Sequence, residues 1–136
     1  MEMKFLGSKI TKINAEKKPD FDGTLELNTN INIKSIEKFQ PENTNIESLK
    51  VNAVFEVKYG ELGEISIEGQ LYLSTEQKIM EDIIESFKSN KYDTPEQLAI
   101  MNIIIQRFSI KAFELEEELG LPIHIRLPTL QAKKEE

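Results

Sequence analysis

The chain has 136 residues and no cysteine, and its 17 basic and 24 acidic side chains give a net charge of −7. A domain of this length buries about two thirds of its unfolded surface, so its core needs no disulfide or metal. The negative charge repels phosphate backbones, which makes nucleic acid an unexpected partner. The sequence shows neither a signal peptide nor an apolar stretch long enough to span a bilayer. We therefore expect one cytoplasmic domain over residues 1–136 without membrane insertion.

The first part of the chain, residues 1–73, shows the period-two alternation of β-strands. Polar and glycine-rich turns divide the alternation into four segments. These segments are residues 3–18, 24–34, 49–58 and 64–73. In the first, the apolar phase changes near Gly7, which predicts a bulge. Four strands with short links predict a four-stranded antiparallel meander with one apolar face.

The part of the chain after the strands, residues 76–119, predicts two helices packed on that apolar face, and hence an α+β fold. Residues 76–88 place apolar side chains at helical spacing. The second helix is expected over residues 95–119, because Thr94 can cap it, Pro95 suits its first turn, and Gln97 completes a capping box. Gly120 supplies its stop.

The long helix is apolar around more of its circumference than one sheet face can cover. We therefore expect part of it to contact another copy of the chain, in a dimer or tetramer. The residues expected at this homo-oligomer interface are Ile100, Ile103, Ile104 and Phe108. The last turns of the helix carry Glu114, Glu116, Glu117 and Glu118, which predicts a solvated acidic tip.

The helix is followed by an apolar ribbon, residues 120–130, in which Leu121, Ile123, Ile125 and Leu127 share one phase. Pro122 and Pro128 disfavour a central strand and favour an extended loop over the surface. Two interpretations stay open: the ribbon closes the open face of the sheet, or it lines a groove that holds unfolded chain. Residues 131–136 are expected to form a frayed tail.

Candidate catalytic chemistry is sparse. His124 is the single histidine, and the sequence offers no residue to orient it as a general base. On the alternating ribbon it is expected to face solvent. No phosphate-binding loop or calcium loop occurs. We therefore expect no catalytic residue, no metal site, no cofactor and no enzymatic activity.

The order of the predicted elements, together with the segment Gly120-Leu121-Pro122-Ile123-His124-Ile125-Arg126-Leu127-Pro128-Thr129-Leu130, resembles the SecB and SecB-like export chaperones. The resemblance implies an ATP-independent holdase whose partners are unfolded client polypeptides. It places the client groove on Leu25, Leu27, Ile31, Ile33, Leu121, Ile123, Ile125, Leu127 and Leu130. The alternative is a non-enzymatic adaptor of the kind that serves toxin–antitoxin systems. The resemblance assigns no translocase partner to the chain. It implies a shallower groove, because little chain follows Leu130 to form the family's last helix.

Overall fold

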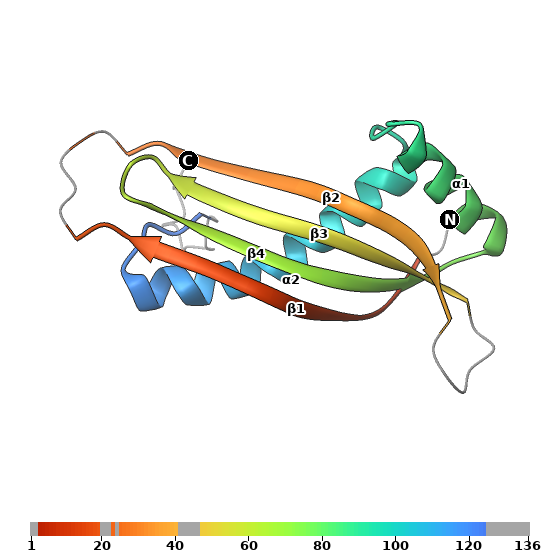
Figure 1. Cartoon of the computed structure of the whole chain (residues 1–136), viewed down its shortest axis with the longest axis horizontal. Coiled ribbons are helices and arrows are strands. Elements are labelled where there is room, and N and C mark those ends of the chain that lie inside the picture. The colour runs from red at the N-terminus through yellow and green to blue at the C-terminus, as the bar shows by residue number, and fades with distance from the viewer. Residues whose placement is uncertain (1–2, 20–22, 24, 41–46, 125–136) are drawn as a thin grey trace, which may run out of the picture.

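One antiparallel sheet and two helices make up the described part of the chain (Figure 1). In this computed structural model, the described residues are 3–19, 23, 25–40 and 47–124. The elements are, in chain order, β1 (Lys4–Lys17), β2 (Leu27–Phe39), β3 (Ser48–Tyr59), β4 (Gly63–Ser74), α1 (Gln77–Lys88) and α2 (Pro95–Leu119). Both helices lie on one face of the sheet, which confirms the predicted α+β class. Within the described residues, neither helix is long and apolar enough to cross a membrane.

The sheet has the strand order β1-β4-β3-β2 and is antiparallel throughout. Strands β2, β3 and β4 form the predicted meander, but β1 pairs with β4 instead of with β2. This order gives the central positions to β3 and β4, whose helix-facing side chains are completely buried. The edges fall to β1 and β2, whose side chains are mostly exposed or half-buried. The two most apolar strands, β3 and β4, therefore each have a strand on both sides. In the predicted order β1-β2-β3-β4, strand β4 would have been an edge strand.

Bulges interrupt the alternation in both edge strands. In β1 the register shifts between Phe5 and Gly7 and again between Ile10 and Lys12, so the predicted bulge near Gly7 lies at Leu6. In β2 the register shifts between Ile33 and Ser35. The extra residue moves Ile36 to the helix-facing side, where it is 6% exposed. The predicted strand ended at residue 34 because the bulge breaks the alternation there, whereas the strand itself continues to Phe39.

Helix α2 has the ends that local sequence signals predict. The backbone N–H of Gln97 donates to Thr94 Oγ1 at 3.2 Å, and Gly120 follows the helix with a left-handed φ of 70°. The second half of the capping box is not formed. The Gln97 side chain is buried and donates from Nε2 to the carbonyl oxygen of Ile83 at 3.2 Å. That bond links the start of α2 to α1.

The buried face of α2 follows a row of residues spaced four apart. Ile100, Ile104, Phe108 and Ala112 are at most 1% exposed and belong to the core with β3 and β4. Of the residues expected at the homo-oligomer interface, Ile100, Ile104 and Phe108 contact their own sheet in the single chain, and Ile103 is half-buried against the same core. The apolar residues on the open side of the helix are instead Leu98, Ile105 and Ile110, which are 50%, 40% and 59% exposed.

Candidate functional site

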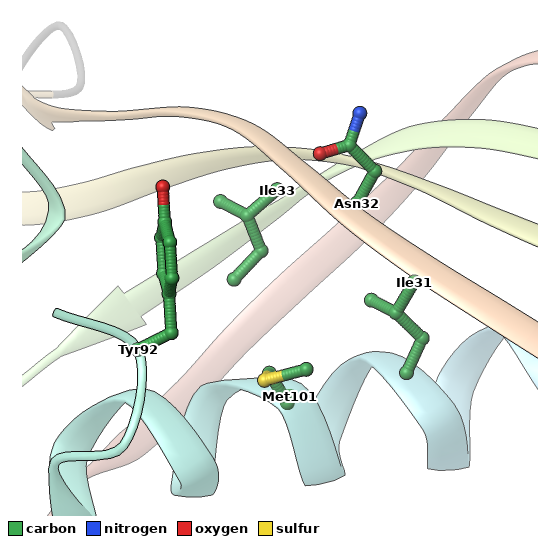
Figure 2. Close-up of a pocket in the computed structure, with 5 residues that line it drawn as sticks. All are labelled: Ile31, Asn32, Ile33, Tyr92 and Met101. Carbon is green, nitrogen blue, oxygen red and sulfur yellow. The ribbon is translucent and has the colours of Figure 1, made fainter. Parts of the chain in front are cut away.

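An apolar groove lies between the edge strand β2 and the N-terminal half of α2. It encloses about 300 Å³ and is lined by Ile31, Asn32, Ile33, Tyr92 and Met101. The strand alternation places Ile31 and Ile33 on the helix-facing side, in register with the buried Phe55 and Ala53 of β3. Figure 2 shows both isoleucines pointing from β2 toward Met101 on α2, with Tyr92 beside them and Asn32 pointing away. The groove therefore has aliphatic walls and an aromatic end.

The groove exists because α2 crosses the sheet obliquely. In Figure 1 the helix begins on the β2 side and ends on the β1 side, where Lys17 Nζ donates to the carbonyl oxygen of Gly120 at 3.3 Å. Much of β2 consequently has no helix over it. Leu25 and Leu27, near the start of β2, are 43% and 41% exposed. The apolar surface thus continues from the groove along this edge of the sheet.

The structure brings together only part of the residue set that was predicted for a client groove. Ile31 and Ile33 line the groove, whereas Leu25 and Leu27 are exposed and are not among its lining residues. Leu121 is 6% exposed and packs in the core, while Ile123 is 37% exposed. The remaining predicted residues, Ile125, Leu127 and Leu130, lie outside the described part of the chain. Tyr92 and Met101 were not predicted at the site, although Met101 lies on the predicted amphipathic helix.

A buried cluster of three polar side chains fixes the chain directly after α2. The Glu116 carboxylate is completely buried. It accepts hydrogen bonds from Tyr59 Oη, from the backbone N–H of His124 at 3.0 Å, and from His124 Nδ1 at 2.7 Å. The backbone N–H of Leu121 also donates to the Glu116 carbonyl oxygen at 2.9 Å. One carboxylate therefore ties strand β3, helix α2 and the start of the ribbon together.

The cluster corrects two predictions made from the sequence. Glu116 was expected on a solvated acidic tip, and only Glu114, Glu117 and Glu118 of that group are exposed. His124 was expected to face solvent, but its side chain is 3% exposed and meets the Phe55 ring edge-on at 5.7 Å between centroids. A buried carboxylate needs hydrogen-bond donors to offset the loss of water, and Tyr59 and His124 supply them.

Burial and hydrogen bonding in the cluster keep the phenol of Tyr59 protonated. Burial, and next the hydrogen bond to Glu116, raise the pKa of Tyr59 far above its ordinary value. The phenol therefore stays neutral and donates. Because a carboxylate only accepts hydrogen bonds, His124 presents an N–H at Nδ1. His124 Nε2 is buried and has no hydrogen-bond partner among the described residues. In the same part of the chain, no three His, Asp or Glu side chains are grouped so that they could hold a metal ion.

The sequence matches no protein-family model and no curated protein. The structure is similar to that of the SecB-like chaperone Rv1957 of Mycobacterium tuberculosis, solved in complex with a ChAD peptide from the antitoxin HigA1 (Rv1956). The TM-score is 0.51 at 10% sequence identity, and the match covers 97% of this chain and 93% of the other. This similarity over nearly the whole length shows that the chain has the fold of the SecB-like chaperones.

Proposed function

We propose that this protein is an ATP-independent chaperone of the holdase type, which binds unfolded polypeptide along the apolar groove between β2 and α2. The groove itself carries the proposal. Its walls are Ile31, Ile33 and Met101, with Tyr92 at one end. The SecB-like fold supports the same function.

The groove suits an extended chain better than a compact ligand. Ile31 and Ile33 are two residues apart on a strand, which is the spacing at which an extended polypeptide places side chains on one side. β2 is also an edge strand, so its outer backbone groups are free of any neighbour within the described sheet. A client could pair with them by β-strand addition. Apolar walls with few polar groups select for hydrophobicity and not for one sequence, as a holdase requires.

The test of this proposal is a pair of matched double variants. Ile31→Thr with Ile33→Thr removes apolar surface from the groove and keeps β-branched side chains in the strand. Ile10→Thr with Ile13→Thr makes the same change on the other edge strand, where both residues are 38–40% exposed. The two substitutions together remove two methyl groups and replace two methylenes with hydroxyls, which for these half-buried side chains corresponds to about 1–2 kcal/mol, or roughly a tenfold weaker complex.

The assay is suppression of light scattering by a chemically unfolded client, without ATP. The wild type and the β1 variant should suppress aggregation equally well, and the β2 variant should need about tenfold more protein. Circular dichroism establishes that all three proteins are folded. The holdase proposal fails if the wild type gives no suppression at several-fold molar excess, or if both variants are equally active.

A second candidate function is that of an adaptor that binds one partner segment. The observation that favours it is the single ChAD peptide bound by the similar chaperone. Competition binding distinguishes the two functions. A holdase is displaced from one unfolded client by many others at comparable concentrations, whereas an adaptor retains a strong preference for one sequence.

The homo-oligomer expected from the sequence remains a proposal, and the exposed apolar side chains of α2 suggest where two copies would meet. Leu98 and Ile105 lie two turns apart on the open side of α2 and are exposed in the single chain. We propose this side as the contact surface between copies. Leu98→Glu with Ile105→Glu should lower the mass measured by light scattering and leave the thermal midpoint almost unchanged. A wild type that is already monomeric would refute this part of the proposal.

A further inference from the structure

The aromatic end of the groove is built at the junction between α1 and α2. Tyr92 lies in the short connection between the two helices, lines the groove, and is 49% exposed. Figure 2 shows its ring beside Ile33, with the hydroxyl pointing away from Met101. The groove therefore presents the ring of Tyr92 and not its hydroxyl.

The hydroxyl of Tyr92 is bonded to the end of α1. Tyr92 Oη donates to Asn90 Oδ1 at 2.8 Å. The ring of Tyr92 also meets the ring of Phe87, near the end of α1, edge-on at 6.2 Å between centroids. Phe87 itself packs against the core. One polar contact and one aromatic contact therefore hold Tyr92 against α1.

Asn90 is fixed by the way in which α1 ends. Its φ of 59° is left-handed, and among the described residues no other non-glycine residue has a positive φ. The Asn90 N–H donates to the Phe87 carbonyl oxygen at 3.1 Å, and the Lys91 N–H donates to the Ser86 carbonyl oxygen at 2.9 Å. This pair of bonds is the Schellman motif, in which glycine or asparagine takes the left-handed position. The helix end thus fixes the backbone of Asn90, and its side chain is left to accept from Tyr92.

We propose that Asn90 is a positioning residue for the client groove, which holds the ring of Tyr92 as a rigid wall before a client binds. This inference rests on the proposed function and assigns to the same site a residue that is not among its lining residues. A side chain that is already ordered loses less conformational entropy on binding, which corresponds to roughly two- to tenfold in affinity. Because its hydroxyl is bonded to Asn90, Tyr92 recognises apolar client side chains through its ring and donates no hydrogen bond to the client.

The test uses three variants that keep the turn intact. Asn90→Gly keeps a residue that adopts the left-handed conformation readily and removes the acceptor. Tyr92→Phe keeps the ring and removes the donor, and the third variant combines both changes. The probe is a fluorescent, reduced and carboxymethylated α-lactalbumin, which stays unfolded. Because all three variants break the same bond, each should bind the probe about threefold more weakly than the wild type. A double variant that binds about ninefold more weakly would contradict the proposal, because independent effects multiply.

The matched control is Tyr72→Phe. Tyr72 Oη donates to Gln70 Oε1 at 2.9 Å, so it also bonds an amide oxygen two residues earlier in the chain. Its neighbours on β4 are buried under the helices, so Tyr72 points to the opposite face of the sheet. This variant should bind the probe as the wild type does, and a loss equal to that of Tyr92→Phe would refute the proposal. A loss in Tyr92→Phe without one in Asn90→Gly would also refute it, because the hydroxyl would then bond the client.

The position of Tyr92 can be measured without any client. The chain has three tyrosines, so their ring signals are few in an NMR spectrum. The wild type should show a nuclear Overhauser effect between the rings of Tyr92 and Phe87, and Asn90→Gly should weaken it. An unchanged effect would show that the aromatic contact alone holds the ring and would overturn the role of Asn90. If no protein binds the probe but the effect weakens, the proposed holdase function fails while the positioning of Tyr92 by Asn90 stands.

Discussion

Replacing Glu116 by alanine should destabilise the folded chain far more than the same change one position later, at Glu117. Glu116 is completely buried, whereas Glu117 is exposed. Both changes replace a glutamate in the same turn of α2 with alanine, so the gain in helix propensity cancels in the comparison. The difference between the two variants therefore reports the buried hydrogen bonds.

The size of the effect follows from the three donors that lose their acceptor. Tyr59 Oη, the His124 backbone N–H and His124 Nδ1 all donate to this carboxylate. A hydrogen bond to a charged group contributes about 1.5–3 kcal/mol, but removing the carboxylate also removes the cost of its own burial. Breaking such a buried cluster costs about 3–5 kcal/mol. For a domain of this size, that is a fall in the urea midpoint of roughly 2 M.

The measurement is urea unfolding followed by circular dichroism at 222 nm, with Glu117→Ala as the control. Glu116→Gln provides a milder variant, because the amide oxygen can still accept from Tyr59 and from the His124 backbone. It should lose about half as much free energy of unfolding as Glu116→Ala. The buried cluster would be refuted as a stabilising contact if Glu116→Ala and Glu117→Ala unfolded within about 0.5 kcal/mol of each other.

Two other predictions concern the core. Because the pKa of Tyr59 is raised by burial and by its bond to Glu116, its contribution to stability is complete below the unfolded pKa of about 10 and is lost as the pH rises above it. We therefore expect the difference in free energy of unfolding between the wild type and Tyr59→Phe to fall above about pH 10, by up to about 1.4 kcal/mol per pH unit. A difference that stays constant with pH would contradict this. At Gly69, an added Cβ would lie 2.6 Å from the Lys9 carbonyl oxygen and 2.9 Å from Phe108 Cζ, so Gly69→Ala should cost about 1–3 kcal/mol in urea unfolding. Gly7→Ala, which meets nothing within 4 Å, should cost none, and equal losses at both positions would argue against this packing.

The element boundaries that depend on neighbouring residues could be predicted from the sequence. Thr94 and Gly120 act within one turn of the ends of α2, so the limits of the helix were correct. The end of β2 could not be predicted in this way. Its bulge depends on pairing with β3, which an alternation pattern does not contain.

The face of α2 and the buried cluster depend on longer-range packing. The helix is apolar on several sides, so hydrophobic spacing alone does not say whether Ile104 or Ile105 faces the sheet. The partners Tyr59 and Glu116 are 57 residues apart, and nothing local marks Glu116 among the four acidic residues of its helix end. A usable signal was the lone histidine eight residues after Glu116, in a ribbon otherwise rich in aliphatic residues.

A single property of α2 accounts for both the groove and the cluster. Its buried row runs through Ile100, Ile104, Phe108, Ala112 and Glu116. Each step of four residues turns about 40° more than a full helical turn, so the buried side rotates by about 160° along the row. A helix with such a row crosses a twisted sheet obliquely. At its start it leaves β2 partly uncovered, which opens the groove, and at its end it carries Glu116 to Tyr59, which fixes the chain beside that groove.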